Sequence, residues 1–159
     1  MRIETFKAHE LSDFSSGALE LDDWLQRRGA KAQEAGDAVL RVAPSDAGRI
    51  VGFHALCAGS VERSLADGPL RRNAPDPIPV LILARLAVER TFQGHGIGAA
   101  LLADVLDRSR VAAMIVGFRA LVIHCHDETA LTFYQRLLPV RLLPGNPLNV
   151  YVPLRLLPD

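Results

Sequence analysis

The sequence predicts a mixed α/β fold with one central, mostly antiparallel sheet flanked by helices. Apolar runs with strand character alternate with segments of helical periodicity, and the apolar run at 79–88 is long enough for a buried central strand. With 159 residues, 49% of them hydrophobic, the chain can bury one sizeable core. We therefore expect a single domain over residues 1–159.

The first third predicts a helix followed by an antiparallel hairpin. Residues 18–35 have apolar side chains at helical spacing until Gly36, a residue that commonly ends helices. Residues 38–43 and 49–59 have strand character, and residues 44–48 (PSDAG) form the turn between them. Alternation in the second strand predicts four core-facing residues: Val51, Phe53, Ala55 and Cys57.

The remaining elements follow from the same rules. Residues 62–79 predict a long loop with one helical turn, because they contain several prolines and little periodicity. The run 79–88 predicts a strand covered on both faces. Further along the chain we expect a helix at 97–116, a strand at 119–126, a helix from Asp127 or Glu128 to 137 and a last strand at 149–156. One stripe of the 97–116 helix is apolar: Ile97, Leu101, Leu102, Val105 and Leu106.

Composition narrows the class of protein. The 18 basic and 18 acidic residues balance, so the overall charge gives no reason to expect a nucleic-acid partner and any basic surface must be local. The N-terminus lacks the apolar core of a signal peptide, and no stretch is long enough to span a bilayer. Cys57 and Cys125 each lie in apolar runs, as expected for reduced, buried cysteines. We expect a cytoplasmic protein without a membrane partner.

The candidate functional site is the segment 93–98 (QGHGIG), which lies between the central strand and a long amphipathic helix. Glycines let the backbone approach a phosphate closely, and the unpaired N–H groups of a first helical turn point toward such an anion. This context predicts a pyrophosphate site. A Walker loop would require Gly-Lys-Ser/Thr at the helix start, and a dinucleotide fold would require GxGxxG at the first βα turn; neither is present. A glycine-rich connection without a ligand is the remaining alternative.

The turn fits the Q/R-x-x-G-x-G/A pattern through Gln93, Gly96 and Gly98, and Asp127–Tyr134 fits N-x-x-A-x-x-F-Y, with aspartate in place of the first asparagine. The chain thereby resembles the GNAT superfamily of N-acetyltransferases. The resemblance implies acetyl-coenzyme A as the cofactor, with Tyr134 as the catalytic residue that protonates the departing thiolate. It implies cofactor contacts at Leu86, Ala87, Val88, Gln93, Gly94, His95, Gly96, Ile97, Gly98, Ala99, Asp127 and Phe133.

Other polar residues have simpler interpretations. Phe133 is expected to pack a helix against the sheet. His54, His124 and His126 lie on predicted strands with no carboxylate or cysteine at metal-ligand spacing, so we expect hydrogen-bonded sheet histidines and no metal site. A dedicated base is not required, because an α-amine with a pKa near 8 is substantially neutral at pH 7 to 8. Glu89 is expected to be structural.

A narrower resemblance rests on 21–25 (LDDWL), 77–79 (PIP), 85–88 (RLAV) and 151–154 (YVPL), which are similar to the TacT-type toxins of toxin–antitoxin pairs. It implies aminoacyl-tRNA as the acceptor and a ribbon-helix-helix antitoxin as the partner. A GNAT enzyme acting on a small-molecule or protein amine, and an inactive CoA- or partner-binding domain, stay open. The apolar tail 150–157 is expected either to extend a sheet or to form a homodimer seam. Candidate RNA-binding cations are Arg27, Arg28, Lys31, Arg71 and Arg72, with Lys7 and Arg63 as further candidates.

Overall fold

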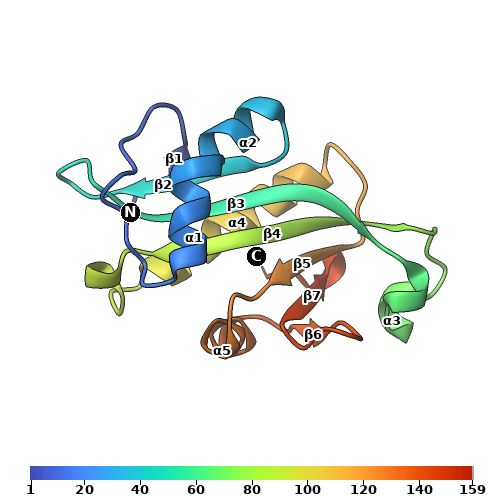
Figure 1. Ribbon diagram of the computed structural model, residues 1–159. Helices are drawn as coiled ribbons and strands as arrows, with labels where there is room; N and C mark the ends of the chain where they lie inside the picture. The colour runs from blue at the N-terminus through green and yellow to red at the C-terminus, as the bar shows by residue number, and fades with distance from the viewer. Residues whose placement is uncertain (159) are drawn as a thin grey trace. The chain divides into compact units, whose positions relative to one another are not determined.

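The computed structural model describes residues 1–158 and confirms the predicted α/β class. Seven strands form one sheet in the order β1-β2-β3-β4-β5-β7-β6 (Figure 1). The pairs β1–β2, β2–β3, β5–β7 and β6–β7 are antiparallel, and β4 and β5 are parallel. The strands are β1 (Glu4–Thr5), β2 (Val39–Pro44), β3 (Ile50–Val61), β4 (Ile78–Val88), β5 (Ala120–His124), β6 (Arg141–Leu142) and β7 (Asn149–Pro153).

The helices are α1 (Leu19–Trp24), α2 (Ala30–Ala35), α3 (Gly68–Arg71), α4 (Ile97–Ala113) and α5 (Glu128–Leu137). A π turn, Leu25–Gly29, joins α1 to α2, so the predicted helix at 18–35 is continuous but contains one wider turn. Short 3₁₀ segments lie at Arg63–Leu65, Arg90–Phe92 and Leu154–Leu156. Of the helices formed by residues 1–158, none combines the length and the apolar character that crossing a membrane requires.

The described residues group into two compact units, and each is described by itself. Unit 1 comprises Met1–Cys57 and Ala84–Val105, and unit 2 comprises Ala58–Leu83 and the residues from Leu106 onward. The single-domain assignment over 1–159 stays a prediction, and Asp159 lies outside the described residues.

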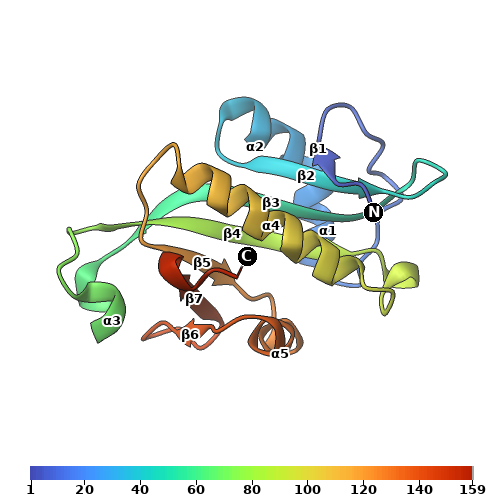
Figure 2. The same ribbon diagram turned by 180° about the vertical axis from the view of Figure 1, so that it is seen from behind.

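Unit 1 has a core on each face of its strands. Phe53 packs with Leu25 and Leu40, and Trp24 lies against them, so the helical segment 19–35 covers one face. Val51 packs with Ile97 and Leu101 of α4. Figure 1 shows α1 in front of the strands of this unit, and the reversed view in Figure 2 brings α4 to the front.

This arrangement corrects the predicted alternation in β3. The residues 50–56 are all buried, because helices cover both faces of the strand, so Val51, Phe53 and Ala55 are not distinguished from their neighbours. Cys57 is only half-buried. A Cβ atom at Gly52 would lie 2.8 Å from Leu101 Cδ1, so only glycine lets α4 approach the strand this closely.

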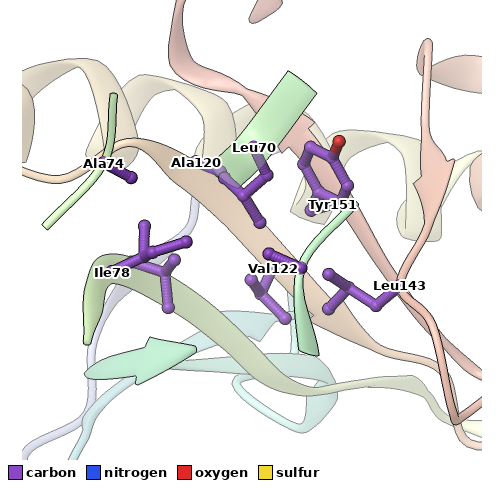
Figure 3. Close-up of a cluster of buried hydrophobic side chains, with 9 residues drawn as sticks. Leu70, Ala74, Ile78, Ala120, Val122, Leu143 and Tyr151 are labelled. Carbon is purple, nitrogen blue, oxygen red and sulfur yellow. The ribbon is translucent and has the colours of Figure 1, made fainter. Parts of the chain in front are cut away.

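Unit 2 packs around Tyr151 of β7, which is fully buried. Figure 3 shows the Tyr151 ring beside Leu70 and Val122 in a cluster that draws on α3, β4, β5 and β7. The Tyr151 hydroxyl donates a hydrogen bond to Asp67. The same carboxylate caps α3 by accepting from the Leu70 N–H at 3.1 Å, and Arg141 donates to it at 3.2 Å.

Several boundaries differ from the predictions. α4 ends at Ala113, not 116, and β7 ends at Pro153, where a 3₁₀ turn follows. β5 ends at His124, so His126 lies beyond the strand. In β4, Ile78, Val80, Leu83 and Ala87 are buried while the other residues are half-buried, so this strand is less fully covered than expected. The two-residue strands β1 and β6 carry too little periodicity to be predicted.

Candidate active site

The glycine turn between β4 and α4 is open to solvent. Gly94 and Gly96 both have φ of 81°, in the left-handed region that favours glycine. A Cβ atom at either position would meet nothing within 4 Å, so open space lies beside the backbone. α4 begins at Ile97, and the N–H groups of a first helical turn lack intrahelical partners. The turn therefore presents backbone donors and the positive end of the helix dipole to an anion.

Side-chain and backbone hydrogen bonds hold the turn in place. The Gln93 amide donates to the Ser16 carbonyl at 2.9 Å and to the Val88 carbonyl at 3.0 Å. The Arg90 N–H donates to the Ser15 carbonyl at 2.7 Å. Because Nε2 of Gln93 donates to both the Ser16 and the Val88 carbonyls, it has no donor left for a cofactor. Its role in cofactor binding stays a prediction.

The other residues predicted to contact the cofactor in this turn divide by exposure. His95 is exposed, and its Nδ1 lies 3.1 Å and 3.0 Å from the carbonyls of Phe92 and Gln93, which can only accept. The ring nitrogen therefore carries a hydrogen. Ile97 is buried in the unit 1 core and offers only its backbone, whereas Ala99 is exposed and Gly98 half-buried.

The end of β4 leads directly into the turn. Ala87 is buried, while Leu86 and Val88 are half-buried, and their backbone contacts with the cofactor stay a prediction. Glu89 makes the contacts expected of a structural residue. Its buried carboxylate accepts from the Thr91 N–H and from Arg49, at 2.8 and 2.7 Å. Burial alone would raise its pKa, but the hydrogen bonds from Thr91 and the charge of Arg49 lower it.

A buried polar cluster fixes α4, and with it the turn, on the strands of unit 1. Asp104 on α4 lies 2.7 Å from His54 Nε2 on β3 and accepts two hydrogen bonds from Arg41 on β2, at 2.7 and 3.2 Å. His54 is fully buried, which agrees with the expected hydrogen-bonded sheet histidine. Although burial alone would raise the pKa of Asp104, the hydrogen bonds and charges of His54 and Arg41 lower it to about 2.

Tyr134, the predicted catalytic residue, lies on α5 in unit 2 and is 4% exposed. Its ring meets the half-buried Phe133 edge-on, with centroids 5.1 Å apart. Within residues 1–158, no hydrogen-bonding group engages its hydroxyl. Burial, and secondarily Cys125, raise its pKa above the usual value, so the hydroxyl keeps its proton at neutral pH. Asp127 caps α5 by accepting from the Ala130 N–H at 2.8 Å, a structural use of this predicted cofactor residue.

The predicted RNA-binding cations fall into two groups. Arg27, Arg28 and Lys31 are exposed and line a groove in unit 1 with a volume of about 670 Å³. Arg71 and Arg72 are exposed on α3 and at its C-terminal end, in unit 2. The groove also contains Trp24 and Arg85, which sequence reasoning did not assign to the site. A cation–aromatic pair between residues 61 positions apart leaves no local sequence signal.

The candidate site consists of strand β4, the open glycine turn and the start of α4. This arrangement is typical of proteins that hold the phosphates of a nucleotide cofactor at a helix N-terminus. Among residues 1–158, no three His, Cys, Asp or Glu side chains gather as a metal site would require.

Comparisons with known proteins identify the family within this class. The model of a family described as an acetyltransferase (GNAT) domain matches residues 37–137. The chain is 41% identical over 143 residues to a tRNA-acetylating toxin of Mycobacterium tuberculosis (strain ATCC 25618 / H37Rv), covering 90% of this chain and 85% of that protein. The chain therefore belongs to the GNAT acetyltransferase family. Acetyl-CoA as the cofactor, the acetyltransferase class and the fold class are confirmed.

Solved structures agree. AtaT complexed with acetyl-methionyl-tRNAfMet superposes with a TM-score of 0.85 at 25% identity, over 97% of this chain and 95% of that chain. A mutant AtaT toxin bound to the C-terminus of the antitoxin AtaR and acetyl-CoA gives a TM-score of 0.82 at 25% identity, over 97% and 93%. Both structures share the α/β architecture described above.

Proposed function

We propose that the chain is the toxin of a toxin–antitoxin pair and acetylates the α-amine of aminoacyl-tRNA, which blocks translation. The similarity to a tRNA-acetylating toxin, 41% identical over 90% of this chain, is the observation that carries the proposal. The structural similarity to AtaT complexed with an acetylated aminoacyl-tRNA supports the same acceptor. Both substrates occur in the cytoplasm, where we place the protein.

The residues of unit 1 fit the cofactor. Acetyl-CoA supplies an acetyl group activated as a thioester. The N–H groups of Gly96, Ile97 and Gly98 would hold its pyrophosphate at the start of α4, in the open space beside Gly94 and Gly96. Backbone groups at Leu86–Val88 would bind the pantetheine arm as a further strand does, and an N–H near Val88 would stabilise negative charge on the carbonyl oxygen.

Tyr134 would act as the general acid. It keeps its proton at neutral pH because burial raises its pKa, and its hydroxyl has no competing partner in the described part of the chain. Such a donor lowers the barrier to departure of the CoA sulfur. The attacking α-amine, with a pKa near 8, is partly neutral at physiological pH, so the chemistry requires no dedicated base.

A small ribbon-helix-helix antitoxin would neutralise the toxin. The relative bound to the C-terminus of an antitoxin supports an antitoxin partner, and the ribbon-helix-helix type follows from the TacT-type resemblance. Homodimerisation is part of the same proposal, but the expected seam at 150–157 is corrected, because Val150, Tyr151 and Val152 are buried in β7 between β5 and β6.

Growth of a bacterial host under tightly induced expression tests the function. Wild type should arrest growth, Tyr134→Phe should not, and arrested cells should accumulate N-acetylated aminoacyl-tRNA. Ala18→Ser, a change outside the turn and α5, serves as a control for expression and should arrest growth as wild type does. If cells that express wild type grow as well as cells that express Tyr134→Phe, the chain acetylates another amine or is an inactive CoA-binding domain.

A further inference from the structure

Asp22 on α1 is a buried carboxylate that the proposed mechanism does not use. It is 7% exposed, and within residues 1–158 no basic side chain pairs with it. A buried carboxylate without a cation is costly unless hydrogen bonds satisfy its oxygens. The groups that donate to Asp22 therefore indicate what this residue does.

Ser16, in the segment that leads into α1, donates to this carboxylate through two different groups. Its N–H lies 3.0 and 3.1 Å from the two Asp22 oxygens, and its hydroxyl donates to Oδ1 at 2.6 Å. The same hydroxyl oxygen accepts from the Ala18 N–H at 3.1 Å. Hydrogen bonds to an ionised acceptor are stronger than neutral ones, so Asp22 fixes the main chain at Ser16 relative to α1.

The carbonyl side of the same segment holds the glycine turn. The Ser16 carbonyl accepts from Gln93 Nε2 at 2.9 Å, and the Ser15 carbonyl accepts from the Arg90 N–H at 2.7 Å. Gln93 Nε2 also donates to the Val88 carbonyl at the end of β4, at 3.0 Å. Ser16 therefore connects Asp22 to the start of the turn and, through Gln93, to the end of the strand before it.

The turn has few other side-chain anchors. Gly94 and Gly96 have no side chains, and the His95 ring contacts only the nearby carbonyls of Phe92 and Gln93. Among the side chains of residues 93–96, that of Gln93 makes the one hydrogen bond to a distant part of the described chain. The direction of the Ser16 carbonyl therefore affects how the glycine backbone is presented.

The far end of the segment is held separately from Asp22. Phe14 is buried and meets Phe53 edge-on, with ring centroids 5.5 Å apart. Gln26 donates to the Phe14 carbonyl at 2.9 Å. These contacts keep the segment on the helical side of unit 1, but they reach neither the N–H nor the hydroxyl of Ser16. Loss of Asp22 should therefore release Ser16 without detaching the whole segment.

We propose that Asp22 is a positioning residue for acetyl-CoA: it orients the Ser16 carbonyl, which through Gln93 holds the glycine turn in the geometry that a pyrophosphate requires. The inference rests on the proposed function, since it takes the glycine turn as the cofactor site. Within the described residues Asp22 makes no hydrogen bond to the turn itself, so it acts through Ser16. Backbone donors bind an anion more tightly when they are ordered before binding, because less conformational entropy is lost.

Calorimetric titration with acetyl-CoA and steady-state transfer to aminoacyl-tRNA test this role. Asp22→Ala should raise the Kd and the KM for acetyl-CoA about tenfold, with kcat unchanged. Asp22→Asn keeps one oxygen for Ser16 and should retain most of the affinity. Asp23→Ala removes an exposed carboxylate on the same helix, one that pairs with Arg27, and is the matched control. It should bind acetyl-CoA as wild type does.

A double-mutant cycle shows whether Asp22 acts through Gln93. Gln93→Met should also weaken acetyl-CoA binding, and Asp22→Ala/Gln93→Met should lose no more affinity than the weaker-binding single variant, because both changes interrupt one series of hydrogen bonds. Losses that multiply in the double variant would overturn the inference. Thermal unfolding checks that each variant is folded. If Asp22→Ala is unfolded at the assay temperature, Ser16→Ala, which removes only the hydroxyl donor, takes its place in the cycle.

The outcomes separate this inference from the proposed function. Equal acetyl-CoA affinity in wild type and Asp22→Ala would overturn the positioning role and leave the proposed function intact. Transfer by wild type to small amines but not to aminoacyl-tRNA, with the tenfold loss in Asp22→Ala preserved, would support the positioning role and overturn the proposed acceptor. Failure of wild type to bind acetyl-CoA would overturn both.

Discussion

Asp104 of α4 lies 2.7 Å from Nε2 of the fully buried His54 on β3, and this contact attaches the helix of the glycine turn to the strands of unit 1. Arg41 completes the cluster with two further hydrogen bonds to the same carboxylate. The position of the glycine turn therefore depends on polar groups that lie outside the turn.

Asp104→Ala should lower the free energy of unfolding by about 3 kcal/mol or more, because it leaves Arg41 and His54 without their shared carboxylate. Asp107→Ala, which removes an exposed carboxylate on the same helix, is the matched control and should change it by less than about 0.5 kcal/mol. Urea unfolding measures both. Equal effects of the two substitutions would show that the cluster does not stabilise unit 1.

The same carboxylate predicts an acid-sensitive stability. Its pKa falls from 3.8 to about 2 on folding, so its stabilising contribution is complete above about pH 4 and is lost as pH decreases toward 2. This shift corresponds to about 2 kcal/mol. The stability difference between wild type and Asp104→Ala should therefore shrink between pH 4 and pH 2. A difference that is constant over this interval would contradict the assigned pairing.

Gly96→Ala should weaken acetyl-CoA binding. Gly48, in the β2–β3 turn, has φ of 84° and open space around it, so Gly48→Ala imposes the same backbone strain away from the phosphate turn. Each substitution should cost about 1 kcal/mol of stability. Isothermal titration with acetyl-CoA should show loss of affinity for Gly96→Ala alone. Equal affinities of the two variants would exclude the turn as the phosphate site.

Tyr151→Phe should destabilise the chain by about 1 kcal/mol, because Asp67 loses the hydroxyl donor but keeps Leu70 and Arg141. Burial, together with the hydrogen bond to Asp67, raises the pKa of Tyr151 to about 12. Its contribution is therefore present below pH 10 and is lost as pH rises toward 12. Thermal unfolding across this interval should show the wild type approaching the variant. Parallel curves would contradict the pairing with Asp67.

Local patterns predicted the elements that face one core or one turn. The stripe from Ile97 to Leu106 is buried as expected, and the hairpin of β2 and β3 forms around the predicted PSDAG turn. The glycines at 94 and 96 adopt the positive φ angles for which such a turn needs glycine. These features depend on residues close together in the chain.

Features that depend on distant residues were not predictable in this way. Nothing near Arg41, His54 or Asp104 indicates that they meet, because 50 or more positions separate Asp104 from each partner. The alternation expected in β3 was wrong because it assumed that one face of the β2–β3 hairpin lies in water. In the structure α4 covers that face. The stack of Arg85 on Trp24 likewise depends on how the first helix packs on the strands.

Tyr134→Phe tests whether the Tyr134 hydroxyl takes part in acetyl transfer or in binding of acetyl-CoA. The hydroxyl has no partner in the part of the chain that the structure describes, so its removal should leave the unfolding temperature and the affinity for acetyl-CoA unchanged. Loss of a general acid should lower kcat about 10²- to 10⁴-fold. A parallel loss of cofactor affinity would indicate that the residue binds acetyl-CoA rather than assisting departure of its sulfur.

The most direct test of the central claim is transfer of labelled acetyl from acetyl-CoA to purified aminoacyl-tRNA by the purified chain. The label should enter the RNA fraction with wild type, be reduced about 10²-fold or more with Tyr134→Phe, and be released by mild base as N-acetyl amino acid. Label that stays off aminoacyl-tRNA with wild type, while small amines or proteins are acetylated in the same reaction, would contradict the assignment as a tRNA-acetylating toxin.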